Sequence, residues 1–215
     1  MRFTVIIPSK NRANAIPCLR AVDKYEPGAW RIVIDDGVNF PADGGDQFDG
    51  LYESVVAGIK PFNYARNCNL GIYVAGGDDV ILLNDDALLE TPFGFTLMQR
   101  EAIQHPEYGV IGAVTNITGQ PLQQPRDVGL REVPHIAFVC VLIPRRTIDR
   151  VGMLDERYCL EYGVEDLDYC EACRRVGLKV RVWDGWYVDH GSLTNTFRGH
   201  PLAARSFAQN KALFD

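Results

Sequence analysis

Adjacent carboxylates follow two apolar runs in this chain of 215 residues. Asn84-Asp85-Asp86 comes directly after Val80–Leu83, and Asp35-Asp36-Gly37 follows Trp30–Ile34. Hard cations such as Mg²⁺ and Mn²⁺ prefer carboxylate oxygens, and they take only one or two from the protein when phosphates and water supply the rest. The first cluster therefore suits a metal–diphosphate site. From the motif alone, an N-cap for a helix over Ala87–Glu90 explains the same residues equally well.

Other polar clusters also have both a functional and a structural explanation. Glu165, Asp166 and Asp168 open a predicted helix, where the helix dipole favours carboxylates. An Asp-Gly turn explains the cluster at 35–37, although a carboxylate there can also accept hydrogen bonds from a base or ribose. Because no second CxxC occurs in the sequence, we interpret Cys170-x-x-Cys173 as buried helix cysteines rather than zinc ligands.

Alternating strands and helices must position these groups. Strands are predicted over 2–7, 30–34, 78–83, 108–115, 135–143, 178–183 and 187–190, and helices over 11–25, 63–75, 91–105, 145–151 and 165–176. Pro17 should disturb the first helix, 118–132 should form a mobile loop, and the tail after Arg198 has little pattern. This alternation predicts an α/β fold with a largely parallel sheet, in which ligands bind beyond the carboxyl ends of the strands.

The composition excludes several classes of protein. A content of 47% hydrophobic residues is enough for a sizeable core, and we expect one domain. The net charge of −6 argues against a general polyanion binder. No apolar run reaches the roughly 18 residues that span a bilayer. The N-terminal segment is interpreted as a strand rather than a signal peptide, so we expect a cytoplasmic protein, with peripheral membrane contact left open.

Taken in order, four segments resemble the family 2 glycosyltransferases with the GT-A fold: VIIPSKNR, VIDDG, ARNCNLGIYVAGGDDVILLNDDALL and GMLDERYCLEYGVEDLDYCEACRRVG. The resemblance runs from about Phe3 to about Thr196, and the block that ends in VDHGS is most similar to the rhamnosyltransferase-like members. It implies a Rossmann-like, mixed and largely parallel sheet flanked by helices. It also implies a single GT-A domain over 1–215, with a nucleotide-sugar half over about 1–116 and an acceptor and catalytic-base half over about 117–215.

The resemblance assigns a donor site and a metal site. The positions matching nucleotide-binding residues are Pro8, Ser9, Asn11, Arg12, Asp35, Asp36, Arg66, Asn67, Asn84 and Asp85. Asp36, or its neighbour Asp35, matches the carboxylate that contacts the base. The segment 84–86 matches the DxD metal motif, with Asn84 in place of the first Asp. Asp86 is therefore the expected principal ligand of Mn²⁺ or Mg²⁺, with Asp85 as its metal or ribose partner. His190 matches a histidine that approaches the metal or the diphosphate.

The same resemblance assigns the catalytic base. Asp166 is the first choice and Glu165 the second, because an inverting displacement needs one base opposite the leaving nucleotide. Asp168 lies on a different helical face and is expected to support the pair. Trp183 and Trp186 either stack on sugar or pack in the core.

The implied function is inverting, metal-dependent transfer of a hexosyl or rhamnosyl group from a UDP- or dTDP-linked sugar to an acceptor hydroxyl, in glycan or polysaccharide synthesis. Two alternatives remain. One is a non-catalytic nucleotide-sugar-binding domain of a larger synthase. The other is a sugar nucleotidyltransferase, which the glycine-free segment PSKNRANAI disfavours. The acceptor stays open among a polysaccharide, a lipid-linked glycan, a protein and a modified nucleic-acid base.

Overall fold

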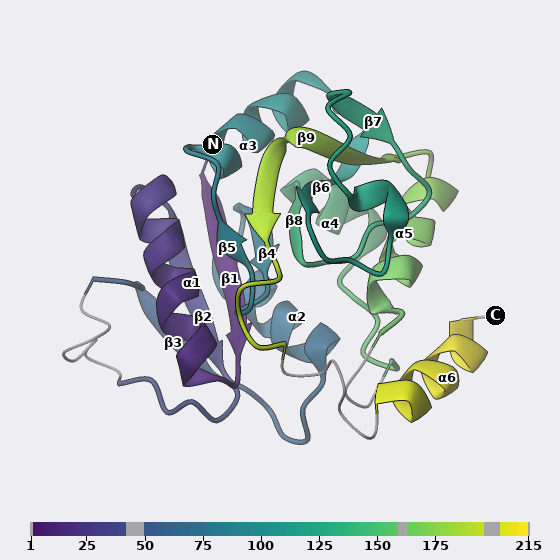
Figure 1. The fold of residues 1–215 in the computed structure, drawn as a ribbon. Coiled ribbons are helices and arrows are strands. Elements are labelled where there is room, and N and C mark those ends of the chain that lie inside the picture. The colour runs from purple at the N-terminus through teal and green to yellow at the C-terminus, as the bar shows by residue number, and fades with distance from the viewer. Residues whose placement is uncertain (1, 42–49, 159–162, 196–202, 215) are drawn as a thin grey trace.

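In the computed structural model, which describes residues 2–41, 50–158, 163–195 and 203–214, helices cover both faces of one sheet (Figure 1). The strands are β1 Phe3–Ser9, β2 Trp30–Asp35, β3 Ser54–Ala57, β4 Asp79–Leu83, β5 Leu88–Leu89, β6 Tyr108–Thr115, β7 Leu130–Glu132, β8 Cys140–Ile143 and β9 Lys179–Asp189. The helices are α1 Arg12–Tyr25, α2 Tyr64–Ala75, α3 Gly94–Gln104, α4 Arg145–Val151, α5 Glu165–Arg175 and α6 Ala203–Phe214, with a 3₁₀ turn η1 at Pro121–Gln123.

Parallel pairing builds the half of the sheet that carries the first two acidic clusters. The strand order is β3-β2-β1-β4-β8-β6-β9-β5, and β7 pairs with β9. β3, β2, β1 and β4 are parallel, with Ser9 opposite Asp35. β8 is antiparallel to β4 and β6, whereas β6 and β9 are parallel. The predicted α/β fold, a mixed and largely parallel sheet flanked by helices, is confirmed, and the carboxyl ends of β1, β2 and β4 open at one edge.

Side-chain alternation along the strands divides the core between the two faces of the sheet. Val5 and Ile7 of β1 pack on the side of α1 and α3, whereas Ile6 packs on the side of α2, α4 and α5. α2 approaches β1 so closely that a Cβ at Gly71 would lie 2.3 Å from Ile6 Cγ2, so only glycine fits there. The five described cysteines are buried and free, which confirms the structural interpretation of the CxxC pair, while Cys159 lies outside the described residues.

Several predicted elements were wrong. α1 runs through Pro17 without interruption, because burial of Cys18 and Leu19 against the sheet outweighs one lost helical hydrogen bond. The expected mobile loop over 118–132 contains η1 and β7, and the weakly patterned tail contains α6. The strands predicted over 178–183 and 187–190 form one strand, β9, with a shift in register against β6. The strand predicted over 135–143 is limited to β8.

The chain after the second acidic cluster and the character of the helices test two further predictions. No helix follows Asn84-Asp85-Asp86, because the chain enters the short strand β5 instead. The N-cap explanation of that cluster is therefore wrong. Of the helices that the structure describes, none combines the length and the apolar character needed to cross a membrane.

Candidate active site

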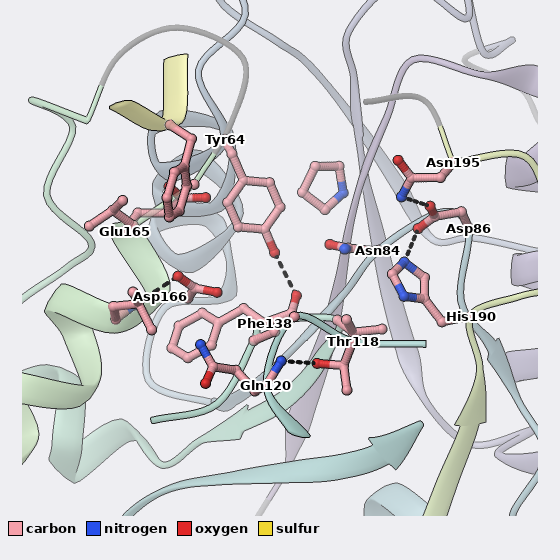
Figure 2. Close-up of a pocket in the computed structure, with 18 of the residues that line it drawn as sticks. Tyr64, Asn84, Asp86, Thr118, Gln120, Phe138, Glu165, Asp166, His190 and Asn195 are labelled. Carbon is pink, nitrogen blue, oxygen red and sulfur yellow. Dashed lines mark hydrogen bonds and ion pairs between the residues drawn. The ribbon is translucent and has the colours of Figure 1, made fainter. Parts of the chain in front are cut away.

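A cleft of about 470 Å³ opens at the carboxyl ends of β1 and β4. Segments far apart in the chain form its walls: Pro8 and Lys10, Phe62 and Tyr64, 84–86, 118–120, 137–139, 163–167, His190, Asn195 and Phe207. Figure 2 shows two polar groups on opposite sides of it, with Asp86, His190 and Asn195 on one side and Glu165 and Asp166 on the other.

Asp85 is anchored to the turn between β1 and α1. Its carboxylate accepts a hydrogen bond from Ser9 Oγ at 2.7 Å and others from the backbone N–H groups of Lys10 and Asn11. Removal from water raises the pKa of Asp85 to about 6, with the charge of Asp86 adding to the rise and the Ser9 hydrogen bond opposing it. Ser9 therefore acts on the cleft through Asp85, and the Asn11 side chain instead caps α1 through Ala13 N at 3.0 Å.

Asp86 faces His190 at the same end of the cleft. Asp86 Oδ1 lies 3.2 Å from His190 Nε2, and Asp86 Oδ2 accepts a hydrogen bond from Asn195 Nδ2 at 2.7 Å. The other ring nitrogen, His190 Nδ1, lies 2.7 Å from the carbonyl oxygen of Ile117. A carbonyl only accepts, so Nδ1 carries a proton. Nε2 then either pairs with Asp86 as part of an imidazolium or, in a neutral ring, offers its lone pair to a cation.

This pair fits a divalent cation. In the neutral ring, the Nε2 lone pair and the Asp86 carboxylate both present electron pairs to an ion bound between them, and a hydrogen-bonded Nδ1–H is the usual arrangement of a metal-bound histidine. Within the described ranges, no group of three or more His, Cys, Asp or Glu side chains could hold a metal. Asp86 and His190 therefore suit an ion that takes its remaining ligands from phosphate and water, as Mn²⁺ and Mg²⁺ do.

The chain that follows β9 completes this end of the cleft. Asn14 Nδ2 donates to the carbonyl oxygen of Thr194 at 2.7 Å, which ties the segment to α1 and places Asn195 against Asp86. Asn116 accepts a hydrogen bond from the backbone N–H of His190 at 2.8 Å and so fixes that residue as β9 ends.

Glu165 and Asp166 begin α5 on the opposite wall. Asp166 accepts hydrogen bonds from the backbone N–H groups of Leu167, at 2.8 Å, and Phe138. Removal from water raises the pKa of both carboxyls, and the charge of Asp166 is the second cause of a rise in the pKa of Glu165 to about 8. Asp168 turns away and lies 3.6 Å from Arg175. The wall thus presents two carboxyl groups with a raised affinity for protons.

The structure separates the roles of Asp35 and Asp36. Both oxygens of Asp35 accept hydrogen bonds from the backbone N–H groups that follow: Gly37 at 2.9 Å, Val38 at 2.8 Å, Asn39 at 3.2 Å and Phe40 at 2.7 Å. Asp35 therefore folds its own loop. The Asp36 side chain is fully buried, with Oδ1 2.8 Å from Lys60 Nζ.

Three other predicted donor residues lie outside the cleft lining. Arg66 donates to the carbonyl oxygens of Ile59, at 2.7 Å, and Pro61. Asn67 is completely buried in α2, and Arg12 is exposed at the start of α1. In contrast, the predicted residues Pro8, Asn84, Asp85, Asp86, Glu165, Asp166 and His190 all line the cleft.

The two tryptophans pack in or against the core, which was one of the two explanations offered for them. Trp186 is fully buried with its ring 5.7 Å from that of Phe95, and Trp183 lies against Gly185. Neither residue lines the cleft, so the sugar-stacking alternative is wrong for this structure.

Sequence reasoning missed much of the cleft lining, including Lys10, Tyr64, Asn195 and Phe207. Lys10 lies within PSKNR, and its ammonium nitrogen is 4.9 Å from the centre of the Phe62 ring. Tyr64 precedes the ARN segment and donates from its hydroxyl to the carbonyl oxygen of Phe138 at 3.1 Å. Both are close to quoted motifs and could have been found there, whereas Asn195 and Phe207 lie in segments without a readable pattern.

Comparisons with known proteins support the fold. No protein-family model matches the chain. The uncharacterized protein y4gI of Sinorhizobium fredii is 24% identical over 216 residues, which is 85% of this chain and 23% of that protein. GalNAc-T7, solved with UDP, GalNAc and Mn²⁺, aligns with 99% of this chain at 13% identity and a TM-score of 0.74. The mannosyltransferase PcManGT from Pyrobaculum calidifontis, solved with GDP-Man and Mn²⁺, aligns with all of it at 16% identity and a TM-score of 0.74.

A third solved structure, S. aureus TarS, aligns with 87% of this chain at 15% identity and a TM-score of 0.66. The chain spans 48% of GalNAc-T7, 64% of PcManGT and 36% of TarS. These solved structures are GT-A glycosyltransferases. At such low identity the likeness shows that this chain has the GT-A fold, with the described cleft at the carboxyl ends of its strands.

Proposed function

We propose that the chain is a metal-dependent, inverting glycosyltransferase domain that moves a sugar from a nucleoside-diphosphate sugar to an acceptor hydroxyl. One observation carries the proposal. The pair Asp86–His190, which suits a divalent cation, faces Glu165 and Asp166 across a single cleft (Figure 2). Solved neighbours of the same fold hold UDP or GDP-Man together with Mn²⁺, which supports the choice of donor and metal.

At the donor end, Asp86 and His190 would hold Mn²⁺ or Mg²⁺, with Asp85, which lines the same cleft, as metal or ribose partner. The ion, when bound, neutralises the negative charge that develops on a departing diphosphate. Lys10 brings an ammonium group to the same cleft, which otherwise carries four carboxylates. Asn195 and Ser9 orient Asp86 and Asp85 through hydrogen bonds of 2.7 Å each.

At the acceptor end, Asp166 acts as the general base, with Glu165 as the second candidate. The acceptor oxygen forms a bond to the anomeric carbon while the bond from that carbon to the diphosphate oxygen breaks, and the hydroxyl proton passes to the carboxylate. A raised pKa makes the ionised carboxylate a stronger base, which is the direction that proton abstraction requires. Asp166 and the pair Asp86–His190 lie on opposite sides of the cleft, which supports an inverting displacement.

The proposal has three further parts: the chain belongs to family 2, the donor is a UDP- or dTDP-linked hexose or rhamnose, and the acceptor is a glycan. They rest on the resemblance of the motifs. The donor half would cover about 1–116 and the acceptor half about 117–215. A non-catalytic binding module needs no buried carboxylates at its acceptor wall, so the pair at 165–166 favours an enzyme.

The test is release of nucleoside diphosphate from UDP-, GDP- and dTDP-sugars in the presence of Mn²⁺, with water or a glycan mixture as the acceptor. The wild-type chain should release it from at least one donor. The Asp86→Ala variant should be inactive, and Asp149→Ala, which removes an exposed surface carboxylate, should match the wild type. Binding of a donor without release from any donor would favour the non-catalytic module. Formation of pyrophosphate from a nucleoside triphosphate and a sugar phosphate would favour the nucleotidyltransferase.

A further inference from the structure

The turn that leads into α5 has an unusual backbone. Gly163 has φ +86° and Val164 has φ +92° with ψ −23°, so two consecutive residues are left-handed directly before Glu165. Glycine adopts this conformation freely, but a β-branched side chain strongly disfavours it. Val164 is also 1% exposed and caps α5 without a side-chain hydrogen bond. Contacts from elsewhere must hold this turn in place.

The contacts come from α6. Asn210 Nδ2 donates to the carbonyl oxygen of Gly163 at 3.0 Å, and the Phe207 ring lies over the same residue. A Cβ at Gly163 would be 3.0 Å from Phe207 Cδ2, so glycine allows the ring this approach. Ser206 and Asn210, one helical turn apart, are both buried, and they form the inward face of α6.

We propose that Asn210 and Phe207 are positioning residues for Glu165 and Asp166. By fixing the left-handed turn, α6 keeps the two carboxyls in the wall of the cleft, where they are only half exposed to water. The role of the pair as a base rests on the proposed function, whereas the partial burial of Glu165 does not. Phe207 is 40% exposed and lines the cleft, so an acceptor bound beside the base would contact the helix that positions it.

Among the residues that the structure describes, charged and titratable groups face Glu165 from α5 and α2. Asp166 lies beside it on α5, and Tyr64 and Cys68 face it from α2. His135 faces the Asp166 carboxyl. Burial raises the pKa of the Tyr64 phenol and the Cys68 thiol, so both stay neutral between pH 5 and pH 8. In that range, Glu165 titrates against Asp166 as its charged neighbour.

The sign of the resulting pH effect follows from linkage. In the unfolded chain Glu165 ionises near pH 4.5, whereas in the folded chain its pKa is raised to about 8. As the pH rises between these values the unfolded chain releases its proton first, so this group makes the fold progressively less stable. The loss is complete once the pH passes the folded pKa. Glu165→Gln removes the group and hence its contribution to the slope.

The experiment measures urea unfolding of the full chain at pH 5 and pH 8 for the wild type, Glu165→Gln, Asn210→Ala and the matched control Gln209→Ala, which changes an exposed residue of α6. Between the two pH values, the unfolding constant of the wild type should rise about tenfold or more relative to that of Glu165→Gln. Gln209→Ala should keep this rise. Asn210→Ala should lose it, because a loosened turn exposes the half-buried Glu165 more fully to water.

Two results would overturn the proposal. One is an Asn210→Ala variant that is destabilised equally at both pH values with the wild-type rise intact. The other is a wild type that shows no rise relative to Glu165→Gln. If Asn210→Ala does not fold, Phe207→Ala at an exposed ring supplies the same comparison. No nucleotide enters this experiment, so a failure of the proposed transferase activity is seen separately. Where transfer is measured, Asn210→Ala should lower kcat and leave the donor KM unchanged.

Discussion

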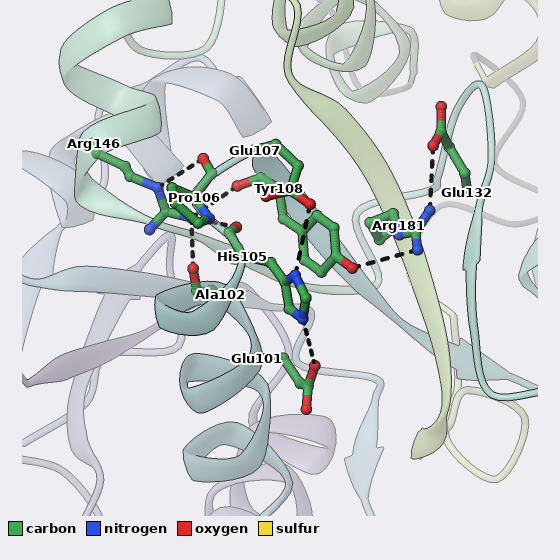
Figure 3. A network of polar contacts seen from close by, with 9 residues as sticks. All are labelled: Glu101, Ala102, His105, Pro106, Glu107, Tyr108, Glu132, Arg146 and Arg181. Carbon is green, nitrogen blue, oxygen red and sulfur yellow. Dashed lines mark hydrogen bonds and ion pairs between the residues drawn. The ribbon is translucent and has the colours of Figure 1, made fainter.

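Two polar clusters at opposite edges of the sheet are built on different principles. The active-site cleft lies at the carboxyl ends of β1 and β4. At the amino ends of β6 and β9 lies a second cluster, here called the arginine network, which consists of Glu101, Ala102, His105, Pro106, Glu107, Tyr108, Glu132, Arg146 and Arg181 (Figure 3). The two clusters differ in how their charges are paired.

In the arginine network, the charged groups have close partners. The Arg146 guanidinium donates to the carbonyl oxygens of four residues: Ala102 at 2.8 Å, His105 at 3.3 Å, Pro106 at 3.2 Å and Tyr108 at 3.1 Å. It therefore satisfies the carbonyl groups left open as α3 ends. Arg181 lies over the Tyr108 ring at 4.8 Å and pairs with Glu132 at 3.3 Å.

In the cleft, by contrast, acidic groups outnumber basic ones. Four carboxyl groups, at Asp85, Asp86, Glu165 and Asp166, share it with His190 and Lys10. The pKa values of Asp85, Glu165 and Asp166 are all raised, because burial there disfavours the charged form. Stability would favour paired or apolar groups at these positions. An excess of carboxyl groups with raised pKa values is the arrangement expected where a cation and a proton are to be bound, so the comparison separates the functional cluster from the structural one.

The largest effect is expected on the cleft side of this comparison. Asp166→Asn should reduce transfer by about 10²–10⁴-fold, because the amide cannot accept the acceptor proton. Donor affinity should stay at the wild-type value, since the residue lies across the cleft from the metal pair. Steady-state transfer rates and donor titrations check both statements. Wild-type transfer by this variant would move the base to Glu165.

The arginine network should respond in stability and leave activity unchanged. Arg146→Met should lower the free energy of unfolding by about 2–3 kcal/mol, because four carbonyl groups lose a charged donor. Arg20→Met, at an exposed arginine of α1, should change it by less than about 0.5 kcal/mol. Urea unfolding gives the stabilities, and turnover per folded molecule should equal that of the wild type. A loss of turnover at full stability would contradict the separation of the two clusters.

A smaller effect is expected at Lys10, which brings positive charge to the cleft. Lys10→Met should weaken the binding of UDP or GDP by about tenfold and reduce the dependence of that binding on NaCl, because one charge contact with the diphosphate is lost. Methionine keeps the apolar stem against Phe62. The control Lys24→Met removes an ammonium group 4.5 Å from the Tyr25 ring at the far end of α1 and should change neither quantity. Weaker binding with an unchanged salt dependence would place Lys10 against the base or sugar.

The sequence predicted well the part of the site that lies at the carboxyl ends of the parallel strands. The apolar runs before the clusters at 35–37 and 84–86 form β2 and β4, and parallel pairing with β1 brings their ends together. Local patterning was sufficient here because a strand buried on both faces is apolar throughout. The start of α5 at Glu165 was likewise predicted, since three acidic residues and the following helical pattern agree.

What the sequence did not predict depends on tertiary contacts. α6 has a weak pattern, and its inward face is polar, with Ser206 and Asn210 buried. The hydrogen bond from Gly37 N–H to Asp35 agrees with the Asp-Gly turn offered for that cluster, but the three further donors at 38–40 come from the folding of the loop. Asp86 and His190 were both assigned to the metal site by the resemblance, but their direct contact at 3.2 Å and the hydrogen bond from Asn195 to Asp86 appear only in the folded chain.

The most direct test of the metal–nucleotide site is calorimetric titration of UDP, GDP and dTDP into the wild type and Asp86→Ala, in Mn²⁺ and in EDTA, with Asp149→Ala as the control. We expect the wild type and Asp149→Ala to bind at least one of the three about 10²-fold more tightly in Mn²⁺ than in EDTA. Asp86→Ala should bind equally weakly in both. Equal affinity of the wild type in Mn²⁺ and in EDTA, or an Mn²⁺ effect that survives Asp86→Ala, would contradict a metal–nucleotide site at Asp86 and His190.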